Sequence, residues 1–337
     1  INMSVTRVLA VRIPGMTVEA IDKSLFGDYP DVPPYRPDPR DANAERTAAV
    51  GTWLASLFTA DPRPDTDADR VRLDALLARR PDVTTLSDAQ LLEYFRSLRP
   101  EARRLFDRHV RNTYGGNVLT SVIAQVSAAV GAGELAATVT AAVGDVESAG
   151  QAFDLWNLSR VVKASPVLTA AFDAGVEGLL DRLRATGEPD AGRFLDAWDT
   201  FIARWGFLGL SVWEFRSPTY ATDPGMPLRM LDRARQAPDE ASPDARAAHL
   251  AAERESAVTE IQRRLSGNPA VLGQFTGAAR NAGRYLAARE RGKLHCAMLN
   301  DAARGAVREL GLRRVARGVG QVRALGGSPA GHRRRGR

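Results

Sequence analysis

The stretch Trp53-Leu-Ala-Ser-Leu-Phe58 carries four large apolar side chains at positions i, i+1, i+4 and i+5. In an α-helix this spacing places all four on one face. Helical patterns of this kind begin near Asn43 and dominate the rest of the chain. No run alternates apolar and polar residues as a half-buried β-strand would. The sequence therefore predicts an all-α protein built as an array of several helices.

Several helix starts carry capping signals. A Ser followed three residues later by Gln is a capping box, and a Ser directly before Pro combines an N-cap with a first-turn proline. These signals occur at Ser87-x-x-Gln90, Ser148-x-x-Gln151, Ser165-Pro166 and Ser242-Pro243. We expect helices over Leu168–Thr186, Ala191–Trp205, Arg246–Leu265 and Gly273–Leu310, the last interrupted near Gly292, and a Pro/Asp linker over Asp61–Asp69.

The chain divides into three parts by composition. Residues 1–40 form an extended, Pro-rich lead-in: residues 1–13 alternate weakly, as one short strand would, and six prolines lie within residues 14–40. Residues 41–312 form the helical domain, in which two subdomains would meet near residues 140–165. Residues 313–337 form a basic tail that we expect to be disordered, because it is rich in Gly and Arg.

Composition limits the function classes. The single cysteine, Cys296, fits a reducing compartment, and no signal peptide or membrane span is evident, so we expect a cytoplasmic protein without a membrane partner. The net charge of +6 comes from the tail, where eight arginines and no acid lie between Leu312 and Arg337. No aromatic residues are interleaved with these arginines, so we do not expect nucleic-acid binding beyond nonspecific attraction.

Familiar catalytic motifs are absent from the sequence. It contains no Gly-rich phosphate loop, no nucleophile elbow and no zinc-ligand spacing among its four histidines, so we assign no catalytic residue and no metal. His109 and His295 lie in segments with a helical pattern, and we weigh a structural or solvated role against a functional one at roughly four to one for each. We therefore favour packing roles for both.

Two clusters of polar and aromatic residues are candidates for ligand binding. The first, within Trp205–Tyr220, offers Trp213, Glu214 and Arg216, and an arginine there would suit a phosphate or carboxylate. Its alternative is a helix-joining loop pinned to the core by aromatics. The second, within Arg284–Lys293, offers Arg289, Glu290 and Lys293, two cations one helical turn apart. Its alternative is a solvated charged face.

Together these clusters and several shorter motifs resemble a known family. The chain is similar, over roughly Asn2 to Gly318, to the central helical region of phosphoenolpyruvate-utilising enzymes, the group of phosphoenolpyruvate synthase, pyruvate phosphate dikinase and rifampicin phosphotransferase. The resemblance is of an actinobacterial type. It rests on Ser4-Val-Thr-Arg-Val, Arg12-Ile-Pro-Gly-Met-Thr, Phe26-Gly-Asp-Tyr-Pro-Asp-Val-Pro-Pro-Tyr, Leu105-Phe-Asp-Arg-His, Gly144-Asp-Val-Glu-Ser, Trp213-Glu-Phe-Arg-Ser-Pro-Thr-Tyr, Leu231-Asp-Arg and Arg289-Glu-Arg-x-Lys293.

The resemblance implies a division of labour between domains. In such enzymes an ATP-grasp domain and a swivelling domain with a phosphate-carrying histidine accompany the helical region, and ATP and Mg²⁺ serve the complete enzyme. Neither domain is recognisable in this sequence, so the resemblance implies that such partners would be supplied elsewhere and that this chain alone binds no cofactor. The helical region of rifampicin phosphotransferase holds the antibiotic, which implies a small-molecule substrate.

The sequence departs from the family pattern at two places. The usual run is close to Gly-x-Arg-Gly-x-x-Glu-Trp-Glu-x-Arg-Ser-Pro, but Leu208 replaces the Arg and Val212 the first Glu. Either an ion pair has become an apolar contact, which can be neutral for stability, or a polar site has decayed. Beyond Gly311 the chain leaves the family pattern, so we expect a truncated or frameshifted product.

Two functions follow from these patterns. The first is a substrate-binding or scaffolding module of a phosphoenolpyruvate-utilising phosphotransferase, truncated and not catalytic alone. The second is a stand-alone helical binder of a hydrophobic, rifamycin-like small molecule, with Trp198, Trp205, Trp213 and Tyr220 lining a cavity between helices.

Overall fold

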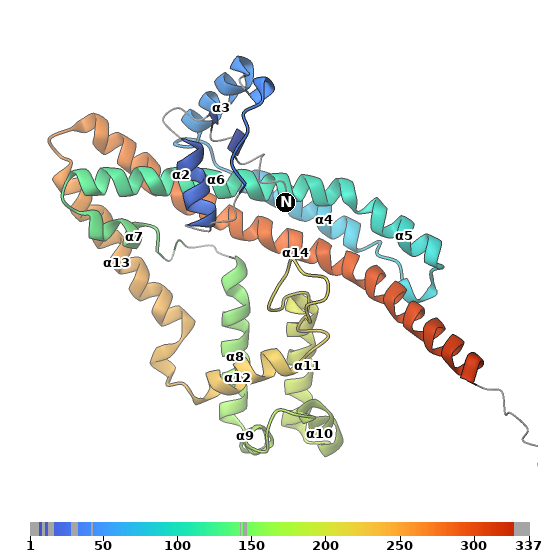
Figure 1. The fold of residues 1–337 in the computed structure, drawn as a ribbon. Coiled ribbons are helices and arrows are strands. Elements are labelled where there is room, and N and C mark those ends of the chain that lie inside the picture. Colours follow the sequence, from blue (N-terminus) through green and yellow to red (C-terminus); the bar gives the residue numbers. More distant parts are fainter. Residues whose placement is uncertain are drawn as a thin grey trace, which may run out of the picture. The chain divides into compact units, whose positions relative to one another are not determined.

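A computed structural model describes residues 7–8, 11–12, 17–27, 33–41, 43–141, 143 and 147–326 (Figure 1). Helices dominate these ranges, and within them the only β-type pairing is an isolated antiparallel bridge between Gly209 and Thr219. The predicted all-α class is confirmed. Residues 1–6, 13–16 and 144–146, which carry parts of the strand and motifs named above, lie outside the described residues.

Most helices follow one another with short connections. The helices are α2 (Val18–Phe26), α3 (Ala44–Ser56), α4 (Arg63–Leu77), α5 (Asp88–Ser97), α6 (Arg99–Ala129), α7 (Ala136–Val139), α8 (Gly150–Ala164), α9 (Pro166–Asp173), α10 (Leu179–Thr186), α11 (Pro189–Trp205), α12 (Gly225–Gln236), α13 (Pro243–Arg264) and α14 (Pro269–Gly326). A long loop joins α11 to α12. Short 3₁₀ turns lie at Pro39–Asp41, Val83–Thr85, Gly133–Leu135, Glu147–Ala149 and Asp239–Ala241.

Three of the four predicted caps are present. The capping box before α5 is complete: the Gln90 backbone N–H donates to the Ser87 hydroxyl at 3.3 Å, and the Ser87 N–H donates to the Gln90 side chain at 2.8 Å. The hydroxyls of Ser165 and Ser242 each accept from a backbone N–H three residues on. The Ser148 side chain lies outside the described residues, and α8 begins after Ala149 without a side-chain cap.

Three predicted boundaries are wrong. The expected linker over Asp61–Asp69 is helical from Arg63, because a proline in the first turn is compatible with a helix. The expected helix over Leu168–Thr186 is two helices, separated by Gly175 and Gly178, whose φ angles are +95° and +61°. The expected interruption near Gly292 does not occur, and α14 runs through it.

The described chain forms two compact units. Unit 1 comprises Ile1–Asp61, Tyr114–Thr140 and Arg254–Tyr285, and unit 2 comprises Pro62–Thr113, Ala141–Glu253 and Leu286–Arg337. Both units are discontinuous in sequence. The chain passes from one to the other after residue 140, at the start of the range where two subdomains were expected to meet, and also after residues 61, 113, 253 and 285.

Unit 1 is organised around one apolar core. The Trp53–Phe58 stripe packs there, with Leu57 fully buried, as its helical spacing predicts. Phe275 and Ile261 are fully buried in the same cluster. The buried side-chain amide of Asn281 donates to the Leu57 carbonyl at 2.8 Å, so it satisfies an acceptor at the end of α3.

Unit 2 contains two apolar cores. One is built by helices α8 to α12, and α12 packs across α8 (Figure 1). Within it a row of aromatic rings runs through Phe172, Phe194, Trp198, Phe201 and Tyr220, with centroids 5.7 to 6.3 Å apart. The other core joins α4, α5, α6 and α14 through leucines and alanines such as Leu73, Leu105 and Leu299.

The predicted lead-in and tail both contain helix. The lead-in includes α2, whose Thr17 N-cap accepts from the Ala20 N–H, and Arg7 and Val8 are helical where a short strand or an extended segment was expected. The tail predicted from residue 313 begins within α14, which continues to Gly326. Residues 327–337 lie outside the described residues.

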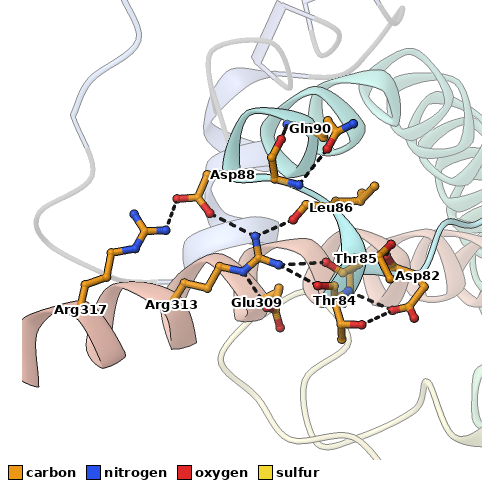
Figure 2. Close-up of polar contacts among 11 residues, drawn as sticks. Asp82, Thr84, Thr85, Leu86, Asp88, Gln90, Glu309, Arg313 and Arg317 are labelled. Atoms are coloured by element: carbon orange, nitrogen blue, oxygen red, sulfur yellow. Dashed lines mark hydrogen bonds and ion pairs between the residues drawn. The ribbon is translucent and has the colours of Figure 1, made fainter. Parts of the chain in front are cut away.

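The first tail arginines make specific contacts within unit 2. Figure 2 shows Arg313 on α14 reaching the turn before α5, where its guanidinium donates to the carbonyls of Leu86 at 2.6 Å and Thr84 at 3.1 Å. Arg317 pairs with Asp88 at 2.6 Å. The bond from Arg317, with help from Arg313, lowers the pKa of the Asp88 carboxyl. These arginines therefore fasten the last part of α14 to the start of α5.

Candidate functional site

The loop between α11 and α12 depends on two glycines that allow close backbone approach. A Cβ at Gly206 would lie 2.4 Å from the Ile202 carbonyl oxygen, and one at Gly209 would lie 2.3 Å from the Pro218 carbonyl oxygen. Both approaches exclude a side chain. The loop closes on itself because the Tyr220 N–H donates to the Leu208 carbonyl at 2.7 Å.

Helix α14 holds this loop by three side chains spaced four residues apart. Such residues lie on one helical face. The Asn300 amide donates to the Val212 carbonyl at 3.2 Å, and the Arg304 guanidinium donates to the Glu214 carbonyl at 3.2 Å. Arg308 continues the row by donating to the Ser217 carbonyl at 3.1 Å. The backbone on both sides of Trp213 is thereby fixed to α14.

Trp213 projects into an aromatic cluster with two residues of α6, which we call the Trp213 cluster: Phe106, His109 and Trp213. The Trp213 ring lies 5.8 Å from the His109 ring and 6.1 Å from the Phe106 ring, centroid to centroid. Trp213 and Phe106 remain 46% and 41% exposed. Because a rigid, half-exposed aromatic surface is what aromatic ligands stack against, the cluster can bind an apolar ring.

His109 is held by the second sequence-predicted segment. Its Nδ1 lies 3.1 Å from the Arg289 carbonyl oxygen. A carbonyl only accepts, so Nδ1 carries the proton and Nε2 of the neutral ring is an acceptor. Burial lowers the pKa of His109, and the cations of Arg289 and Lys293 act in the same direction; the hydrogen bond to the Arg289 carbonyl and the charge of Glu290 oppose them. The histidine therefore offers a hydrogen-bond acceptor beside two half-exposed rings.

The structure brings together four of the six predicted site residues. Trp213 belongs to the cluster, and the backbone carbonyl of Arg289 is hydrogen-bonded to His109. The charges of Glu290 and Lys293 shift the pKa of His109 in opposite directions. The Arg289 guanidinium pairs with Glu290 at 2.7 Å.

The other two predicted site residues, Glu214 and Arg216, have no recorded contact with the Trp213 cluster among the described residues. Both side chains are exposed, and the Glu214 carboxylate accepts from the Arg216 backbone N–H at 2.9 Å. Their assignment to a ligand site stays a prediction.

Phe106, Asn300, Arg304 and Arg308 were not singled out from the sequence. The signal for the last three was present, as a polar side chain every fourth residue along α14, but only the position of the loop shows what they bind. Phe106 belongs to the Leu105-Phe-Asp-Arg-His motif, yet an exposed aromatic on a helix has no distinctive spacing.

Residues 109–290 match the family model described as the rifampicin phosphotransferase fourth domain. The chain belongs to this family. The matched range contains His109, Trp213, Arg289 and Glu290, and it ends three residues before Lys293. The predicted resemblance to the helical region of that enzyme group is therefore confirmed at the level of this domain. A search of curated proteins found no match to the chain.

Leu208 and Val212, the two positions at which the sequence was expected to depart from the family pattern, face apolar surroundings. Leu208 is buried in the core built by α8 to α12, and Val212 packs against that core. That apolar side chains have replaced a charged pair at these positions stays a prediction.

Two of the aromatics proposed to line a hydrophobic cavity, Trp198 and Tyr220, are buried in the core built by α8 to α12 and also line a cavity of about 830 Å³ in unit 2. Trp198 and Trp205 are each only 2% exposed. Trp205 Nε1 donates to Asp154 at 2.7 Å, and Tyr220 donates its hydroxyl to Gln151 at 3.0 Å. Of the four aromatics named from the sequence, Trp213 presents the most surface to a ligand, and the stand-alone binder stays a prediction.

His295 and Cys296 lie in the interior of unit 2. Neither ring nitrogen of His295 has a hydrogen-bond partner among the described residues, and burial lowers its pKa. Burial also raises the pKa of the Cys296 thiol to about 12. Both observations agree with the packing role favoured for this part of the helix.

Two searches of the described ranges gave negative findings. No group of three or more His, Cys, Asp or Glu side chains there could hold a metal ion. None of the helices in that part of the chain is long and apolar enough to cross a membrane.

Proposed function

We propose that this chain is the helical, ligand-binding domain of a phosphotransferase of the phosphoenolpyruvate-utilising type, and that other domains supply phosphoryl transfer. Membership of the rifampicin phosphotransferase fourth-domain family supports the proposal, since the family name places this domain among several. Transfer needs a phosphate cradle, metal-holding carboxylates and an acceptor held in line. In the proposal an ATP-grasp domain and a swivelling histidine domain, with ATP and Mg²⁺, supply the phosphate cradle and the metal-holding carboxylates.

The Trp213 cluster is the observation on which the proposal rests. Phe106 and Trp213 offer two half-exposed rings, and neutral His109 offers Nε2 to a ligand hydroxyl. Sites for small molecules combine apolar and aromatic walls with a few placed polar groups. A ligand with an aromatic body and hydroxyl groups matches this arrangement, and the family name makes rifampicin the first compound to test.

Rifampicin binding to the purified chain can be measured by isothermal titration calorimetry. We expect saturable binding that Trp213→Ala weakens roughly tenfold, because a stacked tryptophan commonly contributes more than 1 kcal/mol to a small interface. Leu210→Ala is the matched control, since Leu210 lies on the same loop and is 86% exposed. Equal weakening by both variants, or none by Trp213→Ala, would place the ligand elsewhere.

A further inference from the structure

Unit 2 contains a cavity that shares no lining residue with the Trp213 cluster. Its volume is about 920 Å³, within the range that drug-sized ligands occupy. One part of its wall is apolar, formed by Phe153 at the start of α8 and by Ala247 and Leu250 on α13. The cavity can therefore bury an apolar body of appreciable size.

Four arginines also line this cavity, and two of them are neutralised by acids that line it too. Arg70 pairs with Glu147 at 2.8 Å. Arg291 pairs with Asp67 at 2.5 Å and with Glu147 at 3.4 Å. Among the described lining residues, two cations and two carboxylates thus balance one another.

The other two arginines, Arg204 and Arg246, are the cations that exceed the acids among the described lining residues. Arg204 pairs at 3.0 Å with Asp154, which is not part of the lining and also accepts from Trp205 Nε1. Arg246 forms no ion pair with any residue that the structure describes. An anionic group of a ligand would meet one shared and one uncommitted guanidinium here.

Two helix starts add to this positive potential. Gly150 and Pro243, the first residues of α8 and α13, both line the cavity. The N-terminus of a helix carries a partial positive charge and favours anions. Both helices are long enough, at 15 and 22 residues, for this effect to develop.

We propose that this cavity binds an amphipathic organic anion. The apolar body lies against Phe153 and Leu250, and one carboxylate, sulfonate or phosphate group lies at Arg204 and Arg246. The proposal goes beyond the function proposed above, since neither its residues nor its ligand chemistry depends on the Trp213 cluster. Its failure would leave rifampicin binding at that cluster untouched.

Two fluorescent probes that differ in one charged group test the proposal. Anilinonaphthalene sulfonate carries an apolar aromatic body and a sulfonate, and phenylnaphthylamine is the same body without it. We expect the wild-type chain to bind the sulfonate more tightly than the neutral probe, with a preference that falls as salt is added. Equal affinities for the two probes would overturn the proposal.

Variants then locate the site. Arg246→Gln should weaken the sulfonate roughly threefold to fivefold, as expected for an exposed charge pair, and leave the neutral probe unchanged. The double variant R204Q/R246Q should remove the preference. Arg263→Gln is the control, since Arg263 is an exposed, ion-paired arginine on the same helix outside the cavity. Ala247→Trp should fill the cavity and block both probes, with circular dichroism reporting the fold. Unchanged sulfonate binding in Arg246→Gln and Ala247→Trp would overturn the proposal.

Discussion

At the scale of single residues, His109 shows how two distant segments define one chemical group. The hydrogen bond to the Arg289 carbonyl orients the His109 ring, and Trp213, more than a hundred residues later in the sequence, packs against it. Its lowered pKa follows from burial, which outweighs the opposing hydrogen bond to the Arg289 carbonyl and the charge of Glu290. The protonation state of His109 is therefore a property of the packed cluster and not of its own helix.

The titration of His109 can be followed by nuclear magnetic resonance. We expect its pKa to lie below the ordinary histidine value of about 6.5, to rise in Lys293→Gln and to fall in Glu290→Gln. Lys163→Gln, which removes a lysine elsewhere in unit 2, is the control. If neither substitution on α14 changed the pKa of His109, the placement of His109 beside Glu290 and Lys293 would be contradicted.

The same shift predicts a pH dependence of stability. Because the folded pKa of His109 is lowered, the unfolded chain binds a proton that the folded chain does not. The contribution of neutral His109 to the stability of the fold is complete above the pKa of this histidine in the unfolded chain. It is lost as pH falls from that value to the pKa of His109 in the folded chain. Burial also lowers the pKa of His295, so this residue adds to the loss of stability in acid.

At the scale of elements, α14 makes two sets of contacts that hold irregular parts of unit 2 in place. One row of polar side chains binds the backbone of the α11–α12 loop, and further along Arg313 binds the turn before α5 (Figure 2). In both cases a long side chain donates to backbone carbonyls that are not used within a helix. Such bonds hold irregular backbone in place, because an unpaired carbonyl is costly when it leaves water.

Arg313→Ala should release the turn before α5 from α14. We expect its Tm to fall by a few degrees, because the carbonyls of Thr84 and Leu86 lose their donor. Arg314→Ala is the matched control: Arg314 is the next residue and is exposed. Equal Tm values for the two variants would show that the contact contributes nothing to stability.

Acid should weaken the neighbouring ion pair between Arg317 and Asp88. The pKa of Asp88 is lowered by the bond from Arg317, so its contribution is present above the unfolded pKa and is lost as pH falls through the folded pKa. The difference in Tm between wild type and Arg317→Ala should therefore shrink at acid pH.

At the scale of the whole molecule, the described residues divide into two units with separate cores. Phe275 in unit 1 and Phe194 in unit 2 are both fully buried, so they form a matched pair. Truncating either to alanine should cost about 3 to 5 kcal/mol, the usual range for a buried phenylalanine.

Hydrogen exchange measured by mass spectrometry distinguishes the two truncations. Phe275→Ala should accelerate exchange mainly in unit 1, and Phe194→Ala mainly in unit 2, because local opening follows the packing that was lost. If both variants accelerated exchange equally in both units, the chain would unfold as one cooperative body.

The sequence alone determined the helical class, three of the caps and the buried stripe around Trp53, because these depend on hydrogen bonds and spacing within a few residues. It also indicated both segments of the candidate site. Only the tertiary structure decided that Trp213 meets His109, that Asn300 and Arg304 bind the loop between α11 and α12, and that α14 continues through Gly292. Those outcomes depend on contacts between residues far apart in the chain, and local patterns carry no information about which distant surfaces will pack.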